Sequence, residues 1–201
     1  MILVIGCSHL PSFIYTHTQA YDGGTKVINV YIDKDFTEND MLKIGAALDD
    51  WNYALNNYIR FNIVSTKFDM EPSILKTIMS SNGLMILKID SNSSFIPKPD
   101  TDGVVLAFTD MVSRHVIMVI RDRFDNPNYE VANDKNGLTL AMRHELGHVL
   151  GLKHILSSTK TLMAPKLTLE YDQCIDKTTI EAVAKEQHLN VHRLNYCTYE
   201  E

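Results

Sequence analysis

Apolar residues recur at three- and four-residue steps after Thr37, and this spacing predicts a long amphipathic helix that packs on a core. Thr37 suits the N-cap position, and Glu38 and Asp40 place negative charge in the first turn, where it favours the helix dipole. The apolar positions are Met41, Ile44, Leu48, Trp51, Leu55 and Tyr58.

Short runs rich in β-branched and apolar residues predict the strands of a sheet. They cover residues 27–32, 61–65, 84–90, 104–109 and 115–121. Polar stretches at 90–103 and 122–137 predict surface loops, and residues 72–79 predict a short helix or a loop. The strand-helix-strand start favours an α+β fold with a twisted mixed sheet and helices behind it.

Two further helices are expected in the second half of the chain. One begins near 136–138, and a last one starts near Asp176, with Ile180, Val183 and Ala184 facing inward. An irregular stretch is expected between His154 and Tyr171. The buried stripe expected on the first of these helices comprises Leu138, Met142, Leu146, Val149 and Leu150, with its histidines on a different face.

Composition fits one globular domain with a sizeable core, since the chain has 201 residues, of which 45% are hydrophobic. The net charge of −6 and the absence of a basic stripe argue against a nucleic-acid partner. No apolar run approaches the ~18 residues of a membrane span. The apolar start is short and has no preceding Lys or Arg, so no signal peptide is recognisable.

The predicted helices and strands divide the chain into a short N-terminal segment and one main domain. Residues 1–25 contain turn signals and predict a lead-in or docking arm, while residues 26–201 form the main domain. The cysteines Cys7, Cys174 and Cys197 are widely spaced and do not make a disulfide framework. We expect free or buried thiols, with a Cys174–Cys197 bridge as the alternative.

The chemistry is concentrated between residues 144 and 154. His144 and His148 lie four residues apart, so both imidazoles leave one face of a helix and can reach one zinc ion. Gly151 can end the helix in a left-handed conformation, which allows His154 to return to the metal. Three neutral ligands leave a fourth position open, as in catalytic sites. Glu145 would lie beside the metal and take a proton from water. The alternative is a helix whose histidines bind no metal.

Residues 27–190 resemble a metzincin protease, and within that clan most closely a matrixin catalytic domain. Three stretches carry the resemblance. The first is the zinc motif, H-E-x-x-H-x-x-G-x-x-H, within residues 138–154. The second is the sequence Leu162-Met163-Ala164-Pro165, which is similar to the matrixin Met-turn. The third is the segment 103–108, which is similar to the edge strand that holds the substrate.

The resemblance implies roles for residues outside the zinc motif. Met163 would support the metal site from below without binding the ion. Val105, Leu106 and Ala107 would bind the substrate backbone, and Leu140 would lie at the base of the pocket for the residue after the cut bond. Two positions depart from the family pattern: Ile155 follows the third histidine, and Leu167 replaces a tyrosine. The structural-zinc histidines of matrixins are also missing from the 90–103 loop.

The sequence therefore predicts a zinc-dependent metalloendopeptidase that cuts extended protein or peptide substrates. The alternative is a metzincin fold that serves as a structural or binding part of a larger assembly, such as a virion, through residues 1–25. Either function favours an extracellular or virion-associated location. Calcium at Asp90, Asp100 and Asp102 is an open alternative to solvated carboxylates. A latency role for Cys7, whose thiolate would block the zinc ion, is a further open alternative.

Overall fold

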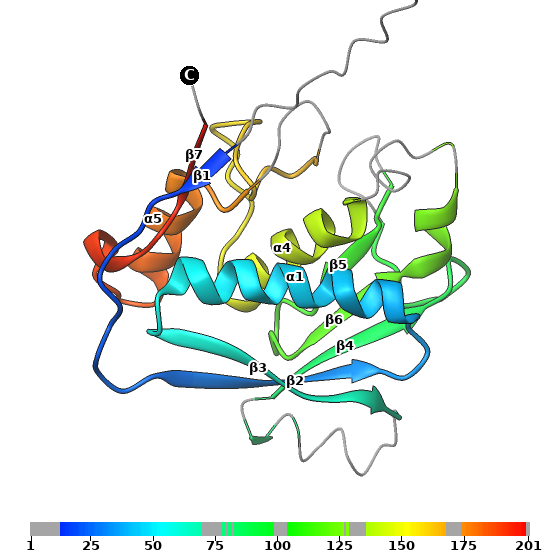
Figure 1. Ribbon diagram of the computed structural model, residues 1–201. Coiled ribbons are helices and arrows are strands. Elements are labelled where there is room, and N and C mark those ends of the chain that lie inside the picture. Colours follow the sequence, from blue (N-terminus) through cyan, green and yellow to red (C-terminus); the bar gives the residue numbers. More distant parts are fainter. Residues whose placement is uncertain are drawn as a thin grey trace, which may run out of the picture.

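A computed structural model describes residues 13–69, 78, 80, 81, 83–98, 104–126, 128, 136–167 and 174–199. Figure 1 shows the arrangement of its elements. The strands are β1 (Phe13–Tyr15), β2 (Lys26–Asp33), β3 (Ile59–Phe68), β4 (Gly83–Ile89), β5 (Ala107–Thr109), β6 (Val116–Ile120) and β7 (Cys197–Tyr199). The α-helices are α1 (Glu38–Leu55), α4 (Gly137–Val149) and α5 (Lys177–Glu186), and the 3₁₀ helices are η1 (Arg121–Asp125) and η2 (Val191–Arg193).

Five strands form one mixed sheet in the order β3-β2-β4-β6-β5. β2 pairs in parallel with β3 and β4, and β4 pairs in parallel with β6. β5 is antiparallel to β6 and forms one edge. Alternate residues of β2, namely Ile28, Val30 and Ile32, are buried in the core. The expected α+β class with a mixed sheet is therefore confirmed.

Helices α1 and α4 cover the same face of this sheet (Figure 1). Trp51 of α1 is fully buried, and its indole N–H donates to the main-chain oxygen of Arg143 in α4 at 2.9 Å. The Arg143 guanidinium donates in return to Asp50 of α1, with an Nε–Oδ2 distance of 2.7 Å. The predicted amphipathic helix, α1, thus holds α4 in place through a buried side chain and two hydrogen bonds.

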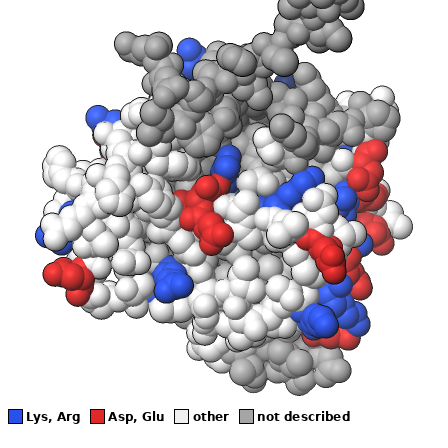
Figure 2. All heavy atoms as spheres, viewed as in Figure 1, with Lys and Arg blue, Asp and Glu red and all other residues white. Residues whose placement is uncertain are grey.

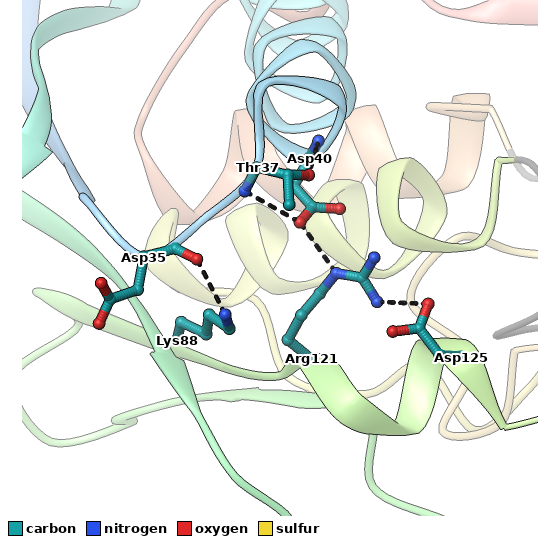
Figure 3. A network of polar contacts seen from close by, with 6 residues as sticks. All are labelled: Asp35, Thr37, Asp40, Lys88, Arg121 and Asp125. Carbon is teal, nitrogen blue, oxygen red and sulfur yellow. Dashed lines mark hydrogen bonds and ion pairs between the residues drawn. The ribbon is translucent and has the colours of Figure 1, made fainter.

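The N-terminus of α1 is held by a polar network (Figure 3). Thr37 is the N-cap of α1, as predicted, and it also forms a reciprocal capping box with Asp40. The buried Asp40 also accepts a 2.9 Å hydrogen bond from Arg121, which pairs in turn with Asp125. The side chain of Lys88 in β4 donates to a carbonyl of the β2–α1 loop. Helix α1 is therefore tied both to the sheet and to η1.

Two expectations for residues 104–137 were wrong in detail. The segment that begins at residue 122 is not all loop, because η1 covers Arg121–Asp125. Burial of Phe124 and the Arg121–Asp125 ion pair stabilise this turn, which is too short for a periodic signal. The strand expected over 104–109 has regular pairing only at Ala107–Thr109, and the next one spans Val116–Ile120.

The first and last described strands, β1 and β7, lie together near α5 (Figure 1). β1 pairs with β7 in an antiparallel two-stranded sheet, and the ring of Tyr21 stacks on Tyr58 at a centroid distance of 3.8 Å. The part of the lead-in that the structure describes thus contacts the main domain, and its role as a docking arm stays a prediction. Cys174 and Cys197 form a disulfide, so the expectation of free thiols was wrong for this pair.

The surface agrees with the acidic, mixed-charge composition. Figure 2 shows acidic and basic side chains interspersed on one face of the molecule. Among the described residues, no helix is both long and apolar enough to cross a membrane.

Candidate metal centre

Three histidines converge at the C-terminal half of α4. The helix supplies His144 and His148, and the chain then turns through Gly151, whose φ of 98° is the left-handed conformation expected there. His154 follows this turn, and one ring nitrogen from each histidine lies within 4.8 Å of the other two. His144 and His148 are buried, whereas His154 is exposed and leaves the site open on one side. The three histidines can therefore hold one metal ion.

Main-chain carbonyls orient the two buried rings. The Nδ1 atom of His144 lies 2.7 Å from the oxygen of Leu162, and that of His148 lies 2.8 Å from the oxygen of Leu152. A carbonyl only accepts, so each Nδ1 must carry the proton and donate. Each Nε2 atom is consequently left with a free lone pair, the form that binds a metal.

The distance between one pair of histidine nitrogens matches tetrahedral coordination. The Nε2 atoms of His144 and His154 are 3.3 Å apart. Two ligands that each lie ~2.0–2.1 Å from zinc at a tetrahedral angle are ~3.3–3.4 Å apart. Imidazole also suits copper, iron and nickel, so the ligand set alone does not identify the ion.

Burial keeps the imidazoles of His144 and His148 neutral. It lowers the pKa of His144 to about 3, and the neighbouring His148 ring adds to that effect. Burial also lowers the pKa of His148, against the opposing effect of its hydrogen bond to Leu152. Neutral imidazoles are the ligand form, so the site is prepared for a cation at neutral pH.

Glu145 is buried beside the histidines, where Thr109 of β5 holds its carboxylate. The Thr109 hydroxyl lies 2.7 Å from Glu145 Oε2. Burial raises the pKa of Glu145 to about 7, although hydrogen bonds from the hydroxyl and the main chain of Thr109 act to lower it. The sequence analysis missed Thr109, because a threonine 36 residues away from Glu145 gives no local signal.

A carboxylate at the start of α5 fixes the segment beneath the histidines. Asp176, the N-cap of α5, accepts hydrogen bonds from the Leu162 main-chain N–H at 2.8 Å and from the Thr161 hydroxyl at 3.0 Å. Leu162 thus donates its main-chain N–H to Asp176 and accepts the hydrogen bond from His144 at its main-chain oxygen. Asp176 was expected only as a helix start, and nothing local in the sequence indicates this second role.

Met163 follows in the same segment and is fully buried. It lies against α4, since a Cβ atom placed on Gly147 would come within 2.4 Å of its sulfur. The Met163 oxygen accepts a 2.8 Å hydrogen bond from the main-chain N–H of Ile155, directly after the third histidine. The predicted Met-turn residue therefore contacts the helix that carries two of the histidines.

The expected substrate-binding residues lie around the edge strand. Ala107 belongs to β5, and the oxygen of Leu106 accepts a 2.9 Å hydrogen bond from β6. The oxygen of Val105 is bound by the guanidinium of Arg123 in η1. Leu140 is buried within α4. Ala107 and Leu140 thus lie on β5 and α4, whereas Val105 and Leu106 directly precede β5, and the substrate contacts of all four stay a prediction.

The calcium and latency hypotheses fall mostly outside the described residues. Asp100, Asp102 and Cys7 all lie outside them, and Asp90 alone is described. Within the described part of the chain, only His144, His148 and His154 form a group of three or more residues that could hold a metal. Calcium thus stays an untested prediction.

Comparisons with known proteins do not assign this chain to a family. No family model matches this chain, and no curated protein matches it either. The fold and the site together define an α+β protein with a three-histidine candidate metal centre, and its function has to be argued from that geometry.

Proposed function

We propose that this protein is a zinc-dependent metalloendopeptidase of the metzincin type. The observation that carries the proposal is a buried carboxylate, Glu145, which directly follows His144 on the helix that supplies two of the three converging imidazoles. A purely structural metal site needs no buried carboxylate next to its ligands, and it is closed by a fourth protein ligand. Here, the described residues supply three ligands and leave one position for water.

The residues divide the chemistry between them. His144, His148 and His154 would hold the zinc ion, which supplies a Lewis acid that polarises the scissile carbonyl and the attacking water. Glu145 takes the proton of that water and later passes it to the leaving amine. Leu162 and Leu152 keep the two buried imidazoles in the ligand tautomer through their carbonyl oxygens.

The sheet edge supports an extended peptide as the substrate. Leu106 points its carbonyl towards β6, so the main-chain groups of the next residue, Ala107, point towards the side of β5 where no described strand pairs. An extended chain can add to that edge by main-chain hydrogen bonds. Leu140, buried nearby on α4, favours an apolar residue after the cut bond.

Elemental analysis and a peptide-library screen on one preparation test this proposal. We expect about one zinc per chain and cleavage that stops with a chelator and returns with zinc. His148→Ala should lose both zinc and cleavage. Zinc below about half an equivalent per chain, not restored by dialysis against zinc, would contradict the metal assignment. Bound zinc without any cleavage would favour the alternative, a structural or binding component of a larger assembly.

A further inference from the structure

Thr109 contacts Glu145 at two points. Its hydroxyl lies 2.7 Å from the carboxylate Oε2 and 3.1 Å from the main-chain oxygen of the same glutamate. Both residues are buried, so water does not compete for this contact. The contact joins the edge strand β5 to α4, the helix that carries two of the histidines.

The hydroxyl is fixed more firmly than a typical serine or threonine side chain. Thr109 lies opposite Ile117 in the β5–β6 ladder, and the next residue, Asp110, donates its main-chain N–H to Val116 at 3.0 Å. A β-branched side chain in a strand also has few χ1 choices. Thr109 thus presents its hydroxyl from a rigid element, whereas the glutamate carboxylate can rotate about its last torsion.

Holding one carboxylate oxygen orients the other. The Thr109 hydroxyl engages Oε2, and the main-chain N–H of Thr109 also interacts favourably with the same carboxylate. A carboxylate held in this way presents an oxygen to a substrate water from a fixed position. Proton transfer requires that atom at hydrogen-bond distance and in line with the proton, so free rotation of the carboxylate would lower the rate.

We propose that Thr109 is a positioning residue that holds the Glu145 carboxylate in its working orientation by a hydroxyl–carboxylate hydrogen bond from the edge strand. This inference rests on the proposed protease function for its kinetic consequence. The contact itself does not depend on that function and can be tested without any substrate.

The kinetic test compares Thr109→Val, which keeps the shape and removes the hydroxyl, with Thr109→Ser, which keeps the hydroxyl. We expect kcat to fall ~10–100-fold in Thr109→Val, the usual range for a residue that supports a site from outside. KM and zinc content should stay near wild type, because no substrate or metal contact is lost. Thr109→Ser should recover most of the rate.

Thr139→Val is the matched control. Thr139 is another buried threonine, on α4 itself, and its hydroxyl donates to the main-chain oxygen of Lys43 at 3.2 Å, away from Glu145. Loss of the Thr139 hydroxyl should leave kcat unchanged. If Thr109→Val does not fold, Thr109→Ala supplies a second variant without the hydroxyl.

An unchanged kcat in Thr109→Val with zinc bound would overturn the proposal. An equal loss in Thr109→Ser would do the same, since it would assign the effect to packing and not to the hydroxyl.

The second readout is the carboxyl ¹³C resonance of Glu145 in metal-free protein, assigned by its absence from Glu145→Gln. It should shift in Thr109→Val and stay near its wild-type position in Thr109→Ser. A resonance unaffected by either change would show that the contact is absent. If wild type cuts no peptide, the proposed function fails and the kinetic role with it, whereas the resonance still reports on the contact separately.

Discussion

Met163 packs directly against Gly147, so closely that a Cβ atom on the glycine would lie 2.4 Å from the methionine sulfur. Gly147 immediately precedes His148, and Met163 immediately follows Leu162, whose carbonyl orients His144. A change in this contact would therefore shift α4 relative to the segment that holds its first histidine. Gly147 stands at an unspecified position of the zinc motif, so this glycine is required by packing and not by the motif.

Gly147→Ala is predicted to destabilise the protein. The added methyl group overlaps a fully buried side chain, and overpacking of this kind costs about 1–3 kcal/mol. Gly45→Ala is the control, because nothing lies within 4 Å of the corresponding position in α1. There the helix preference of alanine should stabilise by about 1 kcal/mol. Urea denaturation of both variants measures the difference, and a stabilising Gly147→Ala would contradict the packing.

Asp40 should make the fold sensitive to acid. Burial alone raises the pKa of Asp40, but hydrogen bonds from Arg121 and Thr37 outweigh it, and the pKa is lowered from its ordinary value of 3.8. A lowered folded-state pKa contributes stability that is complete above the unfolded value and is lost as pH falls through the folded one. We therefore expect part of the unfolding free energy to disappear below about pH 4.

Asp40→Asn tests this ion pair. At pH 7 it should cost about 3 kcal/mol, because it leaves the Arg121 guanidinium without its buried partner. The variant should also lose less stability than wild type between pH 4 and pH 2.5, as measured by denaturation at each pH. Parallel acid profiles for the two proteins would rule out Asp40 as the source of the acid sensitivity.

The disulfide between Cys174 and Cys197 should stabilise the C-terminal region. Closing a loop with a sequence separation of 23 residues is worth about 3 kcal/mol in the chain-entropy account. A reducing agent should lower the thermal midpoint of wild type but not that of the Cys174→Ser, Cys197→Ser double variant. Alkylation of the denatured, unreduced chain should label Cys7 alone, and labelling of all three cysteines would contradict the bridge.

Metal removal should destabilise the fold as well as stop activity. An ion that binds only the folded state stabilises it in proportion to the logarithm of its concentration over Kd, about 4 kcal/mol at a thousandfold excess over Kd. A chelator should therefore lower the thermal midpoint of wild type. His148→Ala should start from the lower midpoint and respond little to the chelator. An equal response in both proteins would point to a metal bound elsewhere.

Sequence patterns correctly predicted the features that depend only on neighbouring residues in the chain. Thr37 caps α1 as predicted, and α5 begins directly after Asp176, where a helix start was expected, because capping requires only a side chain and the next few amides. Gly151 takes its positive φ for the same local reason. The histidine side of α4 is buried as well, since His144 and His148 are buried like the apolar residues, whereas Val149 of the expected buried stripe is only half-buried.

Contacts between distant segments could not be predicted from those patterns. The Thr109–Glu145, Asp176–Leu162 and Cys174–Cys197 contacts depend on how the sheet edge and the C-terminal segment fold back on α4 and α5. Cysteine spacing does not determine connectivity. The strand expected over 104–109 is shortened where the Val105 oxygen bonds to Arg123 instead of a neighbouring strand.

The central claim is that Glu145 acts as the base of a zinc protease, and the most direct measurement compares peptide cleavage by wild type and Glu145→Gln at equal zinc content. The amide is nearly isosteric and still accepts a hydrogen bond from Thr109, so fold and metal should be kept. We predict a loss in kcat/KM of ~10²–10⁴-fold, the range for a positioned acid–base group. Equal cleavage by both proteins, with zinc bound in each, would contradict the account.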